Sequence, residues 1–221
     1  MILAYETATN VCSVSFQDGD GNISEKRIKG RGVHSDNVFL FTQEFMQQYD
    51  FKINDLDAVL VSNGPGSYTG LRIAASALKG ILFETEVPLY TANTLASFAM
   101  ESDYKGGVIH SIIDARRTHV YCQSFELGDK LIKKSELGIV EIADFQKSIQ
   151  TGDCIIGTGI DRLNQELLKD VCICDDSKVT ANSLFKLYQL PNSKEFCMKT
   201  NPEELNPNYI SSGQVNNSNS N

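Results

Sequence analysis

The stretch between residues 57 and 85 constrains the fold more than any other part of the chain. An apolar run from Asp57 to Ser62 is followed by Asn63-Gly-Pro-Gly-Ser-Tyr-Thr-Gly70 and then by a helical pattern from Leu71 to Phe83. A buried strand, a tight glycine turn and a helix in this order form half of a βαβ unit. The sequence therefore predicts an α/β protein.

The glycine turn has some features of an anion-binding loop, because N–H groups at a helix N-terminus attract negative charge. A phosphate-binding P-loop, however, needs Lys-Ser or Lys-Thr after its last glycine, and here Leu71-Arg72 follow Gly70. The dinucleotide spacing G-x-G-x-x-G is also absent. We interpret the stretch as a turn that needs no ligand, capped by Ser67 or Thr69, with anion binding as the alternative.

Small residues recur on the predicted helix at helical spacing, and small side chains let a second helix approach closely. They form a stripe of Gly70, Ala74, Ala77 and Ile81, with Ile73 and Gly80 beside it. We expect Leu71, Leu78 and Leu82 to face the sheet and the stripe to face water until a partner covers it. Ala74→Glu or Ala77→Glu should then leave stability nearly unchanged while preventing association.

Length and charge exclude several classes of protein. With 221 residues the chain can form one large or two small domains. Its net charge of −8 disfavours nucleic-acid binding by the chain alone, because phosphate backbones are repelled. Six cysteines without a C-x-x-C pair suggest small buried thiols in a reducing compartment. No leader or membrane-spanning segment is recognisable, so we expect a cytoplasmic protein.

The N-terminal part predicts three antiparallel strands at 2–6, 11–17 and 22–28. A helix then begins at His34 and runs to about Tyr49, with Val38, Phe41 and Phe45 on one face. Phe39 and Met46 add a second apolar edge. This arc is wider than one sheet contact needs, which indicates a helix covered on two sides.

The same pattern returns about a hundred residues later. A second hairpin is predicted at 108–114 and 119–125, and a strand, a glycine turn and a helix follow at 154–156, 157–159 and 160–168. This repeat indicates an internal duplication into two like domains. We expect domains at 1–103 and 104–200, a segment at 201–212 that returns to the first domain, and a disordered Asn/Ser tail at 213–221.

Four motifs together carry a resemblance to a known family. They are Ile2-Leu-Ala-Tyr-Glu-Thr-Ala-Thr-Asn-Val-Cys-Ser-Val14, the helix start at His34-Ser-Asp36, Gly64-Pro-Gly-Ser-Tyr-Thr-Gly-Leu-Arg-Ile73 and Asp114-Ala-Arg-Arg-Thr-His-Val-Tyr121. The chain resembles the TsaB (YeaZ) family, degenerate paralogues of TsaD that serve in making threonylcarbamoyladenosine in tRNA. The resemblance implies a duplicated actin-like, ribonuclease H-like (ASKHA) α/β fold, each domain with a mixed sheet that starts with three antiparallel strands. The family usually has Asp in place of Glu6 and an Arg where this chain reads Tyr209-Ile-Ser-Ser212.

The resemblance also implies partners. It implies a heterodimer with a TsaD-like paralogue through the first two helices, a TsaE-like ATPase as third component, and a homodimer in isolation. Transfer RNA would be reached only through the complex, which would also hold the ATP and Mg²⁺, and no membrane is involved. The expected partner interface comprises Val38, Phe41, Phe45, Gly70, Ile73, Ala74, Ala77, Gly80 and Ile81.

No catalytic or metal-binding constellation is predicted. By the resemblance, TsaD would carry a second His four residues after His34, so that both rings meet one metal, but this chain has Val38. A lone His34 at a helix start is then expected to cap the helix or face solvent, and neither His110 nor His119 can restore the pair. Ser67 lacks a G-x-S-x-G elbow.

The nucleotide site is weakly indicated. Actin-like ATPases hold phosphates on glycine-rich hairpin turns, and neither hairpin turn here, 7–10 or 115–118, contains glycine. The remaining candidates for Mg²⁺ or phosphate are Glu6, Thr7, Thr9 and Asp114. We prefer the interpretation that Glu6 and Asp114 are satisfied by local turn hydrogen bonds, and that the chain alone binds no cofactor.

The sequence therefore favours a non-catalytic scaffold or activator subunit that acts with TsaD and TsaE. The alternative is an ATP-dependent small-molecule phosphotransferase of the actin-like class. A free-standing tRNA-binding module is disfavoured by the charge, and a metalloprotease is disfavoured by the missing metal pair.

Overall fold

The first sheet contains the N-terminal strands and the last one. A computed structural model describes residues 1–208. The sheet has the order β12-β5-β4-β1-β2-β3. Its strands are β1 (Ile2–Glu6), β2 (Val11–Gln17), β3 (Ile23–Lys29), β4 (Ala58–Ser62), β5 (Leu89–Ala92) and β12 (Cys197–Thr200). The first three are antiparallel neighbours, as predicted, and β4 runs parallel to β1.

The second sheet repeats this plan. It has the order β11-β10-β6-β7-β8, with β9 pairing β7 beside β8. Its strands are β6 (Ile109–Asp114), β7 (His119–Leu127), β8 (Leu131–Lys133), β9 (Gly138–Glu141), β10 (Cys154–Gly157) and β11 (Cys172–Cys174). It also starts with three antiparallel strands, and β10 runs parallel to β6.

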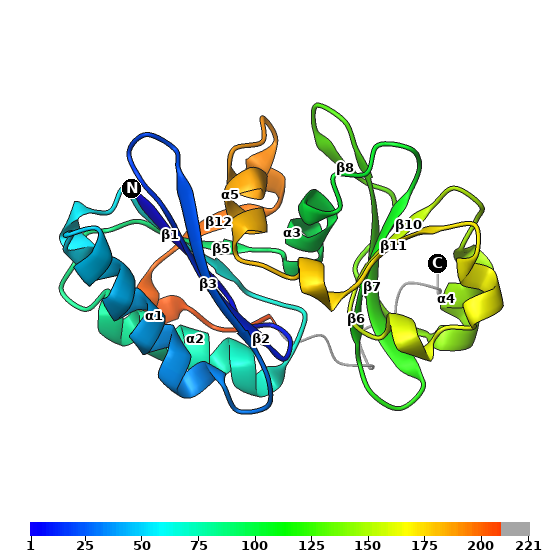
Figure 1. Ribbon diagram of the computed structural model, residues 1–221, viewed down its shortest axis with the longest axis horizontal. Coiled ribbons are helices and arrows are strands. Elements are labelled where there is room, and N and C mark those ends of the chain that lie inside the picture. The colour runs from blue at the N-terminus through cyan, green and yellow to red at the C-terminus, as the bar shows by residue number, and fades with distance from the viewer. Residues whose placement is uncertain (209–221) are drawn as a thin grey trace, which may run out of the picture.

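In the described part of the chain, five α-helices form three layers around the two sheets (Figure 1). Helices α1 (His34–Gln48) and α2 (Tyr68–Ile81) cover the outer face of the first sheet, and α4 (Ile142–Ser148) lies on the outer side of the second. Helices α3 (Thr94–Glu101) and α5 (Asn182–Tyr188) lie between the sheets. None of the helices in residues 1–208 is long and apolar enough to cross a membrane.

Strand alternation explains how the sheets feed separate cores, because successive side chains point to opposite faces. On β1, Leu3 and Tyr5 pack with α1 and α2 in an outer core, whereas Ala4 packs in the central core. The central core joins both sheets through α3 and α5. A third cluster packs Ile112 and Ile155 of the second sheet against Phe145 of α4.

The duplication is broken at one element. Helix α2 follows β4 and its glycine turn, but the corresponding segment after β10 forms only short 3₁₀ helices at Ile160–Arg162 and Gln165–Leu168. The prediction of a helix over 160–168 is therefore wrong. The side chain of Asn164 accepts a hydrogen bond from the backbone N–H of Glu166 and starts a new turn there, in competition with a continuous helix.

The chain returns to the first sheet earlier than expected. Strand β12 pairs with β5 from Cys197, whereas the predicted return began at 201. Further on, Leu205 is buried in the outer core, and the backbone N–H of Asn208 donates to the Asn63 carbonyl at 2.8 Å. The predicted disordered tail at 213–221 and the departure at 209–212 lie outside the described residues.

A buried polar chain ties three strands of the second sheet together. His110 Nε2 lies 2.9 Å from Asp153 Oδ2, and His110 Nδ1 lies 2.9 Å from Ser124 Oγ. Asp153 Oδ2 also accepts from the backbone N–H of Gln150 at 2.8 Å. His110 and Asp153 are both buried. Loss of either side chain therefore takes one of two hydrogen-bond partners from the other, which stays buried.

We predict that His110→Ala lowers the free energy of unfolding by about 1–3 kcal/mol. The Asp153 carboxylate stays buried but loses its hydrogen bond to the imidazole ring. Urea denaturation measures the change. The matched control is His119→Ala in the same sheet, a partly exposed histidine expected to change stability by no more than about 0.5 kcal/mol. Equal midpoints for the two variants would contradict a structural role for His110.

Candidate functional site

The glycine turn before α2 lies directly on the turn between β1 and β2. The Ser67 N–H donates to the Ala8 carbonyl at 2.6 Å. A Cβ on Gly66 would sit 2.3 Å from the Ala8 oxygen, and one on Gly70 would sit 2.0 Å from the Thr7 oxygen. The glycines therefore serve a close backbone contact, and no bound anion is needed to explain them. Ser67 caps α2, as predicted, by accepting from the Gly70 N–H at 3.2 Å.

The alanine stripe of α2 is covered within the chain. Ala74 and Ala77 are only 1 % and 2 % exposed, and they belong to the outer core together with Val38 and Phe45 of α1. The expectation that this stripe faces water is wrong, because α1 of the same chain packs against it. The residues predicted to face the sheet, Leu71, Leu78 and Leu82, are also buried.

Some residues of the predicted partner interface are buried, and the others are exposed. Five of its members are buried, although Ala77 still lines the groove described next. They are Val38, Phe45, Gly70, Ala74 and Ala77. Phe41, Ile73 and Ile81 are partly exposed, and Gly80 is exposed. A contact surface for a partner would therefore lie on the outward side of α2 and not on the small-residue stripe.

A shallow groove of about 440 Å³ runs between the outward sides of α1 and α2. Thr69, Arg72 and Ala77 of α2 line it beside five further residues, which are Ser35 and Phe39 from α1 and Tyr68, Ile73 and Ser76 from α2. Phe39 is 51 % exposed and Tyr68 53 % exposed, although both side chains are large and largely apolar. We call these five residues, together with Gly80 and Phe83, the α1/α2 face. An exposed apolar surface of this kind marks an interaction site in many proteins.

A second concavity, of about 1130 Å³, lies between the two halves of the molecule. Thr9 and His34 line it from the first half, and Asp114, Arg116 and Thr158 line it from the second. Two of the four predicted nucleotide candidates, Thr9 and Asp114, therefore reach this cleft. The other two, Glu6 and Thr7, are fully buried and do not line it.

The Asp114 carboxylate at the cleft is occupied by its own surroundings. Its Oδ1 accepts from the backbone N–H of Arg116 at 2.8 Å and forms an ion pair with Arg162. The Asp114 N–H in turn donates to Thr158 Oγ1 at 3.1 Å. The contact with the Arg116 N–H is the local turn hydrogen bond expected for this acid, whereas Arg162 and Thr158 come from a distant part of the chain.

Glu6 is sealed beneath the β1–β2 turn. Its Oε1 accepts from the Ala8 N–H at 2.6 Å, and its Oε2 accepts from the Ser62 hydroxyl. Burial raises the pKa of the carboxyl to about 7, since the charged form loses its hydration. The enclosed carboxyl does not line the cleft in which Asp114 lies.

His34 differs from its expected role. The ring is buried, and Nε2–H donates to the Val11 carbonyl at 3.2 Å, so the side chain is not solvent-facing. It does not cap the helix either, because Val33 holds the N-cap position. Burial lowers the pKa of the ring, which keeps it neutral. Val38, one turn on, is fully buried and offers no second ligand.

Comparison with known proteins decides the family. A sequence profile described as TsaD, tRNA N6-adenosine threonylcarbamoyltransferase, matches residues 30–166, more than half of the chain. The chain belongs to the TsaD family. The relatives and solved structures that it resembles include proteins named TsaB and YeaZ.

The relatives are distant. The tRNA threonylcarbamoyladenosine biosynthesis protein TsaB of Bacillus subtilis (strain 168) is 27 % identical over 133 residues, a match that covers 60 % of this chain and 58 % of that protein. TsaB of Buchnera aphidicola subsp. Baizongia pistaciae is 25 % identical over 222 residues, covering 93 % of this chain and 97 % of that protein.

Structural likeness confirms the predicted actin-like fold. The structure of YeaZ from Pseudomonas aeruginosa superposes with a TM-score of 0.77 at 20 % identity, covering 95 % of this chain and 99 % of that one. At this identity the likeness speaks for the fold alone, and the roles of single residues rest on the contacts described above.

The α1/α2 face contains residues that sequence reasoning left out of the interface. Ser76 and Tyr68 were not selected, and Phe39 was noted only as part of a second apolar edge. A signal for them exists, because Ile73, Ser76, Gly80 and Phe83 recur at i, i+3, i+7 and i+10 on α2 and its end. The small size of Ala74 and Ala77 drew attention to the neighbouring, buried stripe instead.

We predict that Ala74→Glu destabilises the folded chain, in place of the near-neutral effect expected from sequence. Overpacking alone costs about 1–3 kcal/mol, and a carboxylate without a partner in the outer core adds to this. Urea unfolding of the purified variant gives the value. Ser76→Glu, two residues on and exposed, is the control and should change stability by no more than about 0.5 kcal/mol. Equal stabilities of Ala74→Glu and Ser76→Glu would mean that the small-residue stripe does not lie in the hydrophobic core.

Glu6 makes stability depend on pH. The folded pKa of about 7 lies above the ordinary value of 4.5, so between these values the folded state holds a proton that the unfolded state has released. Stability therefore falls as the pH rises from 4.5 to 7, by about 3 kcal/mol in total at about 1.4 kcal/mol per unit. Glu6→Gln should remove this fall and be more stable than the unmodified chain at pH 8.

Chemical denaturation at a series of pH values measures the Glu6 effect. The control, Glu136→Gln, replaces an exposed carboxylate and should leave the pH profile of the unmodified chain in place. If stability changed with pH in the same way for Glu6→Gln and the unmodified chain, the prediction of a buried, protonated Glu6 carboxyl would be wrong.

Proposed function

We propose that the chain is a non-catalytic scaffold or activator subunit in the formation of threonylcarbamoyladenosine in the anticodon loop of tRNAs, and that it acts by pairing with a TsaD-like paralogue. Membership of the TsaD family and the names of its TsaB relatives support the pathway. The observation that carries the pairing is the α1/α2 face, where the large apolar side chains of Phe39 and Phe83 are 51 % and 67 % exposed beside a groove.

Gly80 is the most specific indication that a partner packs on this face. It is exposed in the last turns of α2, and a Cβ placed on it would meet nothing within 4 Å. The fold therefore does not require a glycine there, although glycine in a helix costs about 1 kcal/mol relative to alanine. A partner backbone passing close to this point accounts for the absent side chain. Ile73, Ser76 and Phe83 lie along the same side, and Phe83 is 67 % exposed.

The proposed contact pairs two helices from each subunit. A paralogue with the same fold would lay its own first two helices against α1 and α2, and a durable complex of this kind buries about 1,600 Å² in total. Phe39 and Ile73 would supply the apolar centre, and Ser35 and Ser76 would allow close packing. In isolation the same face would pair with a second copy as a twofold dimer.

The chain supplies little chemistry of its own in this proposal. Glu6 is enclosed, Asp114 is paired with Arg162, and Val38 stands where a second metal-binding His would be needed. The assembled complex would bind ATP and Mg²⁺ through the TsaD-like and TsaE-like subunits. With a net charge of −8, this chain would meet tRNA only as part of that complex, in the cytoplasm and away from membranes.

The cleft of about 1130 Å³ between the two halves favours one other function, an ATP-dependent phosphotransferase. Calorimetry with ATP and Mg²⁺ on the isolated chain separates the two proposals. The scaffold proposal expects no turnover. Micromolar binding accompanied by ATP hydrolysis or phosphoryl transfer would overturn it.

We predict that Phe39→Asp and Ser76→Glu yield folded monomers that no longer support tRNA modification in a reconstituted mixture. A carboxylate in an apolar contact would be desolvated without a partner, which weakens binding strongly. Light scattering after gel filtration gives the mass, and incorporation of labelled threonine into tRNA gives the activity. Met198→Glu is the control, because Met198 is also an exposed apolar side chain but lies on β12 at the edge of the first sheet. Variants that stay dimeric and active would place the interface elsewhere.

A further inference from the structure

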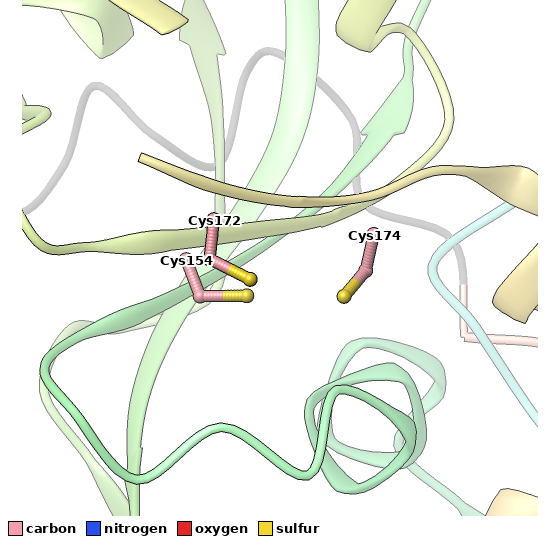
Figure 2. Close-up of side chains that lie close together, drawn as sticks. All are labelled: Cys154, Cys172 and Cys174. Carbon is pink, nitrogen blue, oxygen red and sulfur yellow. The ribbon is translucent and has the colours of Figure 1, made fainter. Parts of the chain in front are cut away.

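Three cysteine side chains converge at the edge of the second sheet. Figure 2 shows Cys154 on β10 and Cys172 and Cys174 on β11, with their sulfur atoms directed toward a common space. The three Sγ atoms lie within 4.8 Å of one another. Nothing in the proposed function uses them.

Strand register brings the three thiols together. In the parallel pair of β10 and β11, Cys154 is the partner of Cys172, and Ile156 is the partner of Cys174. Residues two apart on a strand point to the same face, so Cys172 and Cys174 both project on the side of Cys154. The spacing in sequence hides this, because Cys154 and Cys172 lie on different strands and no C-x-x-C pair is present.

The cluster is buried on one side and open on the other. Cys154 and Cys174 pack in the central core, whereas Cys172 is exposed. It is the one exposed thiol of the six cysteines, all of which fall within the described residues. Strand β11 is the edge of its sheet, so an ion can reach the sulfur atoms from solvent beside Cys172.

We propose that these three thiols bind one thiophilic metal ion, Zn²⁺ or Cu⁺. Thiolate is a soft ligand that selects these two ions among the common ones. With Zn–S bonds of about 2.3 Å, sulfur atoms around one tetrahedral ion stand about 3.8 Å apart. From a spread of at most 4.8 Å, they need to close by only about 1 Å, which side-chain rotation provides. For Zn²⁺ a water on the open side completes the coordination.

Binding of the ion is balanced by loss of protons. Three thiols release three protons to solvent and give three thiolates, so a Zn²⁺ site carries one net negative charge. The ion would cross-link the short edge strand β11 to β10 and so hold the 3₁₀ turn at Asp176–Lys178 that follows it. The site is independent of the missing His pair at His34, and its role is structural.

Cobalt is the first probe of the site. The full chain, reduced and kept anaerobic, is titrated with Co²⁺. One equivalent should produce sulfur-to-cobalt charge-transfer bands and the visible bands of tetrahedral Co²⁺, and Zn²⁺ should bleach both. Competition with chromophoric chelators then gives the affinities for Zn²⁺ and Cu⁺ separately and shows which ion the site prefers. Octahedral Co²⁺ spectra without charge transfer would overturn the proposal.

Cys172→Ser tests the cluster without disturbing the core, because Cys172 is exposed. The affinity of Cys172→Ser for the preferred ion should fall by more than about tenfold. Mutation of residues that only hydrogen-bond to metal ligands already lowers metal affinity about 10–100-fold, and Cys172 is itself a proposed ligand. The control is Cys197→Ser on β12 in the other sheet, which should bind as the unmodified chain does. Equal metal affinities of Cys172→Ser and Cys197→Ser would overturn the proposal. It would also be overturned if the purified chain held a Cys154–Cys172 disulfide and bound no metal once this disulfide was reduced.

Discussion

The first half of the molecule depends on one backbone contact, where the N-terminus of α2 rests on the turn between β1 and β2. Gly66 and Gly70 permit it because any side chain there would overlap the carbonyl oxygens of Ala8 and Thr7. The contact fixes the position of α2 over the sheet, and thereby the groove that α2 forms with α1. It also packs the β1–β2 turn down over the strand below, where Glu6 bonds to Ser62 and Ala8. The same turn keeps its Thr9 on the cleft between the two halves.

Much of the fold can be predicted from the sequence, since it is set by local patterns. The strand runs of β1 to β3 and the glycine-rich turn after β4 are visible without coordinates. Periodicity also identifies which residues of α2 share a face. It does not identify the neighbour that covers this face, and here Ala74 and Ala77 are covered by α1 rather than by another subunit. The error at 160–168 has a different cause, a side chain of Asn164 that bonds locally.

The sites were less predictable, because they depend on strands that are far apart in the sequence. Asp153 meets His110 only because β10 runs parallel to β6, and Cys154 meets Cys172 only because β11 runs parallel to β10. The enclosure of Glu6 likewise depends on Ser62, which comes from β4. Composition and spacing can nominate such residues as candidates. Register and burial decide whether they face a cleft, a core or one another.

The broken duplication has a consequence for assembly. The first domain has two long helices on its outer face, whereas the second has the short α4 and two 3₁₀ turns in the corresponding place. Within residues 1–208 only one end of the molecule therefore offers a helix pair, and the proposed pairing through it would close after two subunits instead of growing into a filament. Self-pairing and pairing with a paralogue would also be mutually exclusive. The supply of free subunits would then set how much of each complex forms.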